Sequence, residues 1–306
     1  MSANAESRYR FKPMTQCNMC GSPAHKHKIL GRRLDRSQGR RPGRLTGISV
    51  GIRRCNDCGL IYSDPQPIPL DLQDHYGVPP ADYWKPEYFQ LDEAYFAHEI
   101  AILGRLTNGT TGLRTLDIGA GLGKQMIALE RAGHEAHGFE PSHSFHSMAI
   151  ERMAIRPERL RLGMLEEIDY PADHFDMVSF GAVLEHLYDP AASIEKALRW
   201  TRPGGFIHIE VPSADWLIGR LINLYYELIG SDLRGNLSPM HPPYHLYEFT
   251  LNSFISHARL SGYEVAHHEY FVCQTFLPRI LSSVLVPIMR RTNTGMQLSI
   301  WLKKTT

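Results

Sequence analysis

The sequence has few cysteines, no long apolar run and almost no net charge. Four of its five cysteines form two C-x-x-C pairs, which favours a metal site in a reducing compartment over a disulfide scaffold. No apolar run reaches the ~20 residues needed to span a bilayer, and no apolar signal segment is visible at the start. We therefore expect a globular, cytoplasmic protein.

The net charge is small, but it is unevenly distributed. The whole chain carries +1, whereas residues 1–60 hold thirteen Lys and Arg against three acidic residues, a net charge of +10. The remainder of the chain is therefore acidic. A basic front of this kind predicts an anionic partner, which would be nucleic acid, a phosphorylated substrate or a membrane surface.

The pattern along the chain predicts two domains. Residues 1–70 form a basic module that ends in the proline-spaced stretch DPQPIPLD. In residues 71–306, short buried strands such as LRTLDIG, HEAHGFE and FIHIEVP alternate with helices, which predicts an α/β fold with a parallel sheet. A helical insertion, interpreted as a lid, interrupts this domain at about 213–245.

Some elements can be placed more closely. Apolar residues at helical spacing predict an amphipathic helix over 86–106. A second helix is predicted from Thr250, as its N-cap, to Gly262. Residues 263–272 and 295–304 are predicted to be the closing strands.

The most informative stretch is TLDIGAGLGKQMIALERAGHEAHGFEPS, residues 115–142. A buried strand ends in Asp117 and is followed by glycines at G-x-G-x-G spacing, which allow the backbone to turn tightly and approach a ligand. Glu140 ends the next strand, 23 residues after Asp117, where a carboxylate can accept hydrogen bonds from ribose hydroxyls. Lys124 stands where a dinucleotide site needs its third glycine, and no P-loop sequence is present.

This stretch resembles motif I of the class I S-adenosylmethionine (SAM)-dependent methyltransferases. The stretches LGMLEEIDYPADHFDMVSFGAVLEHLYDP and RPGGFIHIEVP resemble the later motifs of that family, in the same order. The resemblance implies a seven-stranded, Rossmann-like sheet whose last strand is antiparallel, and SAM as the cofactor. It also implies a set of cofactor-binding residues, which are Asp117, Gly119, Ala120, Gly121, Gly123, Glu140, Met164, Leu165 and Gly181.

Two segments offer candidate catalytic residues. Glu185 and His186 follow the fourth strand of the core, where a parallel sheet places its substrate, and a histidine there can accept a proton. Tyr244 and His245 lie in HPPYHLYEFT, which resembles a stretch of methyltransferases from sugar and glycan biosynthesis. The alternative for the first pair is a cap for the next helix or a brace for the loop. For the second pair it is a loop ordered by proline and aromatic packing.

The two cysteine pairs predict a closed zinc site. Cys17, Cys20, Cys55 and Cys58 form C-x-x-C-G repeats, and four thiolates suit a tetrahedral structural Zn²⁺ with no open position. The 34 residues between the pairs are more than in a plain zinc ribbon.

The function expected from this resemblance is methyl transfer from SAM to a small acceptor, which would be a sugar, a nucleotide-sugar or a glycan precursor. The stretch Cys55–Pro67 is similar to one in sugar C-methyltransferases that act on nucleotide-linked deoxysugars. Ribosomal-RNA guanine methyltransferases also join a metal module to this core, so an RNA methyltransferase whose basic zinc module binds RNA is an alternative. A non-catalytic SAM-fold partner subunit is the third.

Two further segments are apolar nearly all round. Residues 216–230 and 276–291 are interpreted as a lid, a dimer contact or a peripheral membrane contact, and burial within the domain is the alternative. The sequence does not choose among these, and it does not indicate an oligomeric state or the acceptor atom.

Overall fold

The computed structural model describes residues 9–33, 50–70, 84–235, 245–273 and 277–306. They form two compact units. We call one of them the sheet unit, which comprises Gln73–Gly181, Glu195–His208 and Lys303–Thr306. We call the other the knuckle unit, because it contains both C-x-x-C turns, and it comprises Met1–Leu72, Ala182–Ile194 and Ile209–Leu302. The first break, at Leu72, lies close to the expected boundary at residue 70, but the knuckle unit also takes in two later segments of the chain.

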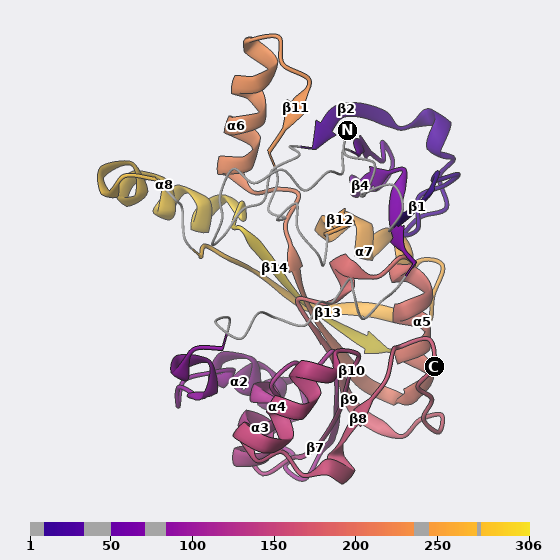
Figure 1. The fold of residues 1–306 in the computed structure, drawn as a ribbon, viewed down its shortest axis with the longest axis vertical. Helices are drawn as coiled ribbons and strands as arrows, with labels where there is room; N and C mark the ends of the chain where they lie inside the picture. Colours follow the sequence, from indigo (N-terminus) through magenta and orange to yellow (C-terminus); the bar gives the residue numbers. More distant parts are fainter. Residues whose placement is uncertain (1–8, 34–49, 71–83, 236–244, 274–276) are drawn as a thin grey trace. The chain divides into compact units, whose positions relative to one another are not determined.

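A seven-stranded sheet in the order β13-β14-β10-β9-β6-β7-β8 confirms the predicted number of strands (Figure 1). Its strands are β6 (Arg114–Ile118), β7 (Glu135–Glu140), β8 (Leu160–Leu162), β9 (Phe175–Gly181), β10 (Thr201–Pro212), β13 (Tyr263–Phe271) and β14 (Gln297–Lys304). Within the sheet unit β6 pairs in parallel with β7 and β9, and β7 with β8. Their carboxyl ends therefore meet at one edge.

Helices of the sheet unit cover these strands. Both α3 (Lys124–Arg131) and α4 (His143–Met153) pack against β7 (Figure 1). The predicted helix over 86–106 is wrong in its first half, because only η3 (Pro86–Phe89) and α2 (Ala97–Leu106) form. Phe96 has a left-handed backbone (φ 62°), which a right-handed helix cannot contain.

The knuckle unit is built on a second sheet of five strands, in the order β11-β2-β3-β4-β12. These are β2 (Lys28–Arg33), β3 (Gly51–Arg54), β4 (Ile61–Asp64), β11 (Leu233–Arg234) and β12 (Tyr247–Glu248), and β1 (Tyr9–Lys12) pairs separately with β5 (Gln66–Pro69). The two edge strands come from residues more than 160 positions downstream of β4. The N-terminal module is thus completed by late segments of the chain.

The α-helices of this unit include α6 (Leu217–Leu228), α7 (Leu251–Ala258) and α8 (Arg279–Thr292). Thr250 caps α7 as predicted, since its hydroxyl accepts from the amide of Ser253 at 3.0 Å, but the helix ends at Ala258 and not at Gly262. Trp216 and Ile218, at the start of α6, form a buried cluster with Met289 of α8. Among the described residues, no helix is both long enough and apolar enough to cross a bilayer.

Candidate functional site

The glycine turn between β6 and α3 has the backbone that its sequence requires. Gly119, Gly121 and Gly123 have φ of 68°, 55° and 72°, a region that favours glycine. A Cβ on Gly123 would also lie 2.7 Å from Cγ1 of Ile155, too close for any side chain. Substitution is therefore disfavoured by the backbone conformation at all three glycines, and at Gly123 by packing as well.

Glu140 is clamped at the end of β7. Its two carboxylate oxygens accept hydrogen bonds from the backbone amides of Gly121 and Ser142, each at 2.8 Å. The residue is 6% exposed, and burial raises its pKa although both amides act in the opposite direction. Each oxygen keeps a second lone pair, so the carboxylate is fixed in place and can still accept from a ligand.

Asp117 lies one strand away, at the end of β6. It is opposite Gly138 of β7 and Ser179 of β9 in the sheet register, and the hydroxyl of Ser179 lies 3.1 Å from its Oδ1. Gln125 in turn donates to Ser179. Burial, with the nearby charge of Glu140, raises the pKa of Asp117 to about 7 against the opposing Ser179 hydrogen bond.

The other predicted cofactor residues lie at the same sheet edge. The amide of Ala120 donates to the carbonyl of Phe139 at 3.0 Å, and the amide of Gly163 donates to that of Glu140 at 3.1 Å. The second bond holds the loop that carries Met164 and Leu165 beside β7. Gly181 ends β9, and the side-chain oxygen of Gln125 lies 3.5 Å from where its Cβ would stand. Sequence reasoning missed Gln125 and Ser179, although a serine inside the apolar strand DMVSF was a usable signal.

The predicted catalytic residues Glu185, His186 and His245 meet in the knuckle unit. One ligand atom from each lies within 4.8 Å of the others, and the two imidazole centroids are 4.5 Å apart in an edge-to-face arrangement. Glu185 is 1% exposed, and burial raises its pKa to about 8. Tyr244, the fourth candidate, lies outside the described residues.

The backbone around this cluster is held by side chains that the sequence did not single out. Arg33 donates from Nη1 to the carbonyl of His245 at 2.6 Å and forms a salt bridge of 3.3 Å with Glu248. Asn18, inside the first C-x-x-C pair, donates to the carbonyl of Tyr188 at 3.0 Å. Partners 170 and 215 residues away along the chain leave no local trace in the sequence.

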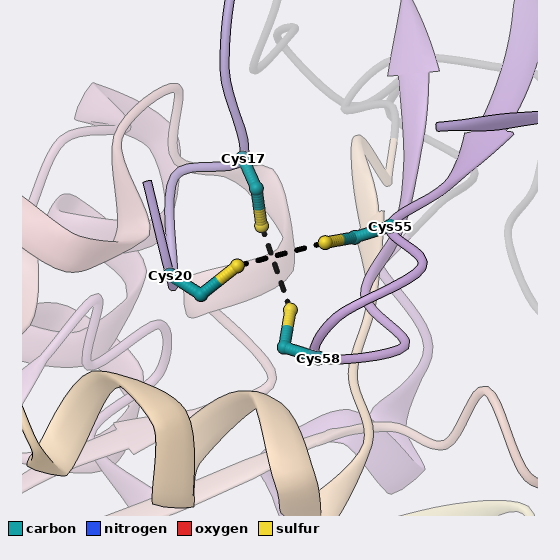
Figure 2. A group of neighbouring side chains, drawn as sticks. All are labelled: Cys17, Cys20, Cys55 and Cys58. Carbon is teal, nitrogen blue, oxygen red and sulfur yellow. Dashed lines mark hydrogen bonds between the residues drawn. The ribbon is translucent and has the colours of Figure 1, made fainter. Parts of the chain in front are cut away.

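Figure 2 shows the four sulfur atoms of Cys17, Cys20, Cys55 and Cys58 pointing to one centre. Two Sγ–Sγ separations are 3.5 Å, close to the ~3.8 Å expected around a tetrahedral Zn²⁺ with Zn–S bonds of about 2.3 Å. In each pair the amide of the first cysteine donates to the carbonyl five residues later, and the glycine amide donates back to the first cysteine's carbonyl. The cysteines therefore fit a structural zinc ion.

A basic pocket of about 290 Å³ lies between the five-stranded sheet and α6. Its lining includes four cationic side chains, which are Lys28, Arg54, Arg220 and Arg234. Glu227 and Glu248 also line it. Glu248 is paired with Arg33, and the lining cation Arg220 is paired with Asp215, which leaves Lys28, Arg54 and Arg234 as the cations that face an anion. This pocket suits an anionic group of small-molecule size.

The helices α6 and α8, which lie in the apolar segments predicted at 216–230 and 276–291, expose several large apolar side chains. On α6, Leu224 is 51% and Leu228 77% exposed; on α8, Ile280 is 82% and Val284 59% exposed. Among the described residues of the knuckle unit these side chains are exposed, which leaves the lid, dimer and membrane interpretations open.

The chain is similar to known methyltransferases. A family model described as a methyltransferase domain matches residues 91–268. An uncharacterized methyltransferase of Schizosaccharomyces pombe is 31% identical over 143 residues, which cover 42% of this chain and 51% of the relative. A ubiquinone biosynthesis O-methyltransferase of Bradyrhizobium diazoefficiens is 31% identical over 116 residues, 37% of this chain and 45% of the relative.

The match thus spans about half the length of these curated relatives. Among solved structures, a SAM-dependent methyltransferase from Mesorhizobium loti is similar at 16% identity with a TM-score of 0.47, over 67% of this chain and 97% of that one.

Proposed function

Because the chain belongs to the methyltransferase-domain family, we propose that it transfers a methyl group from SAM to a small acceptor, which is a sugar, nucleotide-sugar or glycan precursor that carries a phosphate or is linked to a nucleotide. The observation that carries the acceptor class is the basic pocket lined by Lys28, Arg54, Arg220 and Arg234. When bound, SAM supplies an electrophilic methyl carbon on a sulfonium that leaves as a neutral thioether.

The cofactor assignment is supported by two buried carboxylates at one sheet edge. Asp117 and Glu140 are 5% and 6% exposed, so their charges are costly without a cation. SAM carries positive charge on its sulfonium and its ammonium group. Glu140 would accept from the ribose hydroxyls, Asp117 would face the amino group, and the Met164–Leu165 backbone would flank adenine.

The acceptor must lose a proton for transfer, and the Glu185–His186–His245 cluster is where this chain can take it. His186 is half-buried, and an imidazole nitrogen can accept a proton, as a general base requires. Glu185 follows Gly181, a predicted cofactor residue, by four residues.

We assign the four-cysteine cluster to a structural zinc ion that holds the backbone around the catalytic cluster. Asn18 binds Tyr188 from the first pair, and the hydroxyl of Thr250 donates to the carbonyl of Cys58 at 2.7 Å in the second. Four thiolates leave no open position on the ion, so it would take no part in the chemistry.

The RNA methyltransferase alternative is weakened because three arginines of the basic front are paired or buried within the chain. Arg32 pairs with Asp232 at 2.8 Å, Arg53 pairs with Asp64 at 2.6 Å, and Arg33 is buried. These cations are already neutralised within the chain. The arginines of residues 36–44 lie outside the described residues.

One experiment separates these functions. The protein is incubated with methyl-labelled SAM and, in parallel, with nucleotide-sugars and with total RNA. Label in nucleotide-sugars supports the proposal, and label in RNA alone would show that the acceptor class is wrong. The variants Lys28→Ala and Arg54→Ala should raise KM for the nucleotide-sugar without changing SAM affinity. Failure to bind SAM at all would favour a non-catalytic subunit.

For α8 we propose contact with an anionic membrane surface. Ile280, Val284 and Ile288 lie on one face of the helix and are 43–82% exposed. The helix carries Arg279, Arg290 and Arg291 and no acidic residue, so its charge complements anionic lipid. Flotation with anionic vesicles, lost in Val284→Asp, would support this contact, whereas a concentration-dependent dimer without flotation would replace it.

A further inference from the structure

We propose that Glu185, His186 and His245 bind one divalent transition-metal ion, at a site separate from the four-cysteine cluster. Their ligand atoms lie within 4.8 Å of one another, and all three residues belong to the knuckle unit. Two imidazoles and one carboxylate suit Zn²⁺, Mn²⁺ or Co²⁺ better than Mg²⁺, which prefers oxygen ligands. Three protein ligands also leave coordination positions open, as in catalytic zinc sites.

The second, independent observation is the state of Glu185. The side chain is 1% exposed, and within the described part of the chain its Oε2 has no hydrogen-bond partner. Burying an unsatisfied carboxylate oxygen is costly, and native structures seldom leave one. Arg33, the buried cation of this unit, is committed to the carbonyl of His245 and to Glu248. A metal ion would satisfy the oxygen that no group among the described residues reaches.

The backbone that carries these ligands is already fixed. The amide of Leu246 donates to the carbonyl of Glu185 at 2.7 Å and ties β12 to the short helix η5 (Leu184–His186). The amide of His186 donates to the carbonyl of Val183 at 2.9 Å. Ligand atoms that lie about 2.1 Å from one tetrahedral ion are roughly 3.4 Å from one another. Small side-chain rotations would bring the three ligand atoms from their present separation of up to 4.8 Å to that distance.

The role of this ion rests on the proposed function and deepens it. An open position would take an oxygen of the acceptor and lower the pKa of its proton, which passes to water. His186 would then act as a ligand and not as the base itself. The acceptors favoured by this site are those that present an oxygen at or beside the methylated atom.

Cobalt titration of the full chain tests the site. The protein is first dialysed against a chelator too weak to strip four thiolates, and Co²⁺ binding is followed by calorimetry and visible absorption. We expect one equivalent whose spectrum lacks thiolate-to-cobalt charge transfer. Loss of an outer partner already costs roughly 10- to 100-fold in metal affinity, so His245→Ala should bind Co²⁺ more than about 100-fold more weakly.

The controls decide between outcomes. His98→Ala removes an exposed histidine outside the cluster and should bind like the wild type. Glu185→Gln, nearly isosteric, repeats the test if His245→Ala does not fold. The site is refuted if the wild type does not bind this equivalent of Co²⁺, or if both cluster variants bind it fully.

The catalytic role of the ion is tested separately. Methyl transfer that is unchanged in protein free of Co²⁺ and Zn²⁺ at the cluster refutes that role and leaves the proposed function standing. Cobalt binding without transfer to any sugar acceptor supports the site and contradicts the acceptor class.

Discussion

Replacing Glu140 by Gln is the sharpest test of the cofactor site. The change keeps the shape of the side chain and removes its charge. Both carboxylate oxygens now accept backbone amides at 2.8 Å, from Gly121 and Ser142. In Glu140→Gln one of these amides would face an NH₂ group, so one backbone donor and one ribose hydroxyl would lose their acceptor.

The magnitude follows from the kind of bond lost. A hydrogen bond to a charged group contributes about 1.5–3 kcal/mol, and the bond that remains would weaken because its acceptor is neutral. We therefore expect SAM affinity to fall by about 2–4 kcal/mol, which is roughly 30- to 1000-fold. The unpaired amide should also lower the free energy of unfolding by about 1–3 kcal/mol.

Calorimetric titration with SAM and S-adenosylhomocysteine measures the affinity. The matched control is Glu135→Gln, the same change at the other end of β7, where the carboxylate is half-exposed and pairs with Arg159. It should leave binding unchanged. Analogues that lack a ribose hydroxyl should bind the wild type more weakly but should bind Glu140→Gln about as well as the parent ligand does. A folded Glu140→Gln protein that binds SAM within about threefold of the wild type would refute the ribose assignment.

Three further outcomes are expected. Burial raises the pKa of Asp117 to about 7, whereas an aspartate in the unfolded chain ionises near pH 4. The free energy of unfolding should therefore fall as pH rises from about 4 to about 7. Urea denaturation should show this fall in the wild type but not in Asp117→Asn. Gly123→Ala should lower the free energy of unfolding by about 2–5 kcal/mol, because it adds both a strained left-handed backbone and a clash. Gly133→Ala, whose Cβ would meet open space, should lower it by only about 1–2 kcal/mol. Urea denaturation measures both changes. Cys20→Ser should lose its zinc and melt at lower temperature, whereas Cys273→Ser, an exposed cysteine outside the cluster, should keep both, as metal analysis and thermal melting would show.

The cofactor edge could be predicted because its geometry is local. Asp117, the glycines and Glu140 follow from two adjacent strands and one turn, and the structure brings them together at one sheet edge. Glu185, His186 and His245 were predicted as separate candidates, but not as a group. Its assembly depends on Leu246 bonding to Glu185 and on Arg33, contacts between segments that share no local pattern.

Other features could not be predicted from patterns at all. Two-residue strands such as β11 have no periodicity to detect. Arg33 stands in a basic run that is typical of solvent-exposed residues, yet it is 2% exposed because Glu248 balances its charge. The helix predicted over 86–106 failed since apolar spacing gives no sign of the left-handed backbone of Phe96.

The late completion of the five-stranded sheet also has a consequence for biosynthesis. Tyr62 of β4 pairs with Tyr247 of β12, which is translated 185 residues later. At about 5–20 residues per second, the ribosome needs roughly 10–40 s to cover that distance. During this interval the cysteine pairs have left the ribosome without the strand that closes their sheet. The nascent chain therefore holds four thiols in a partly built module, and early capture of zinc would protect them from oxidation until β12 arrives.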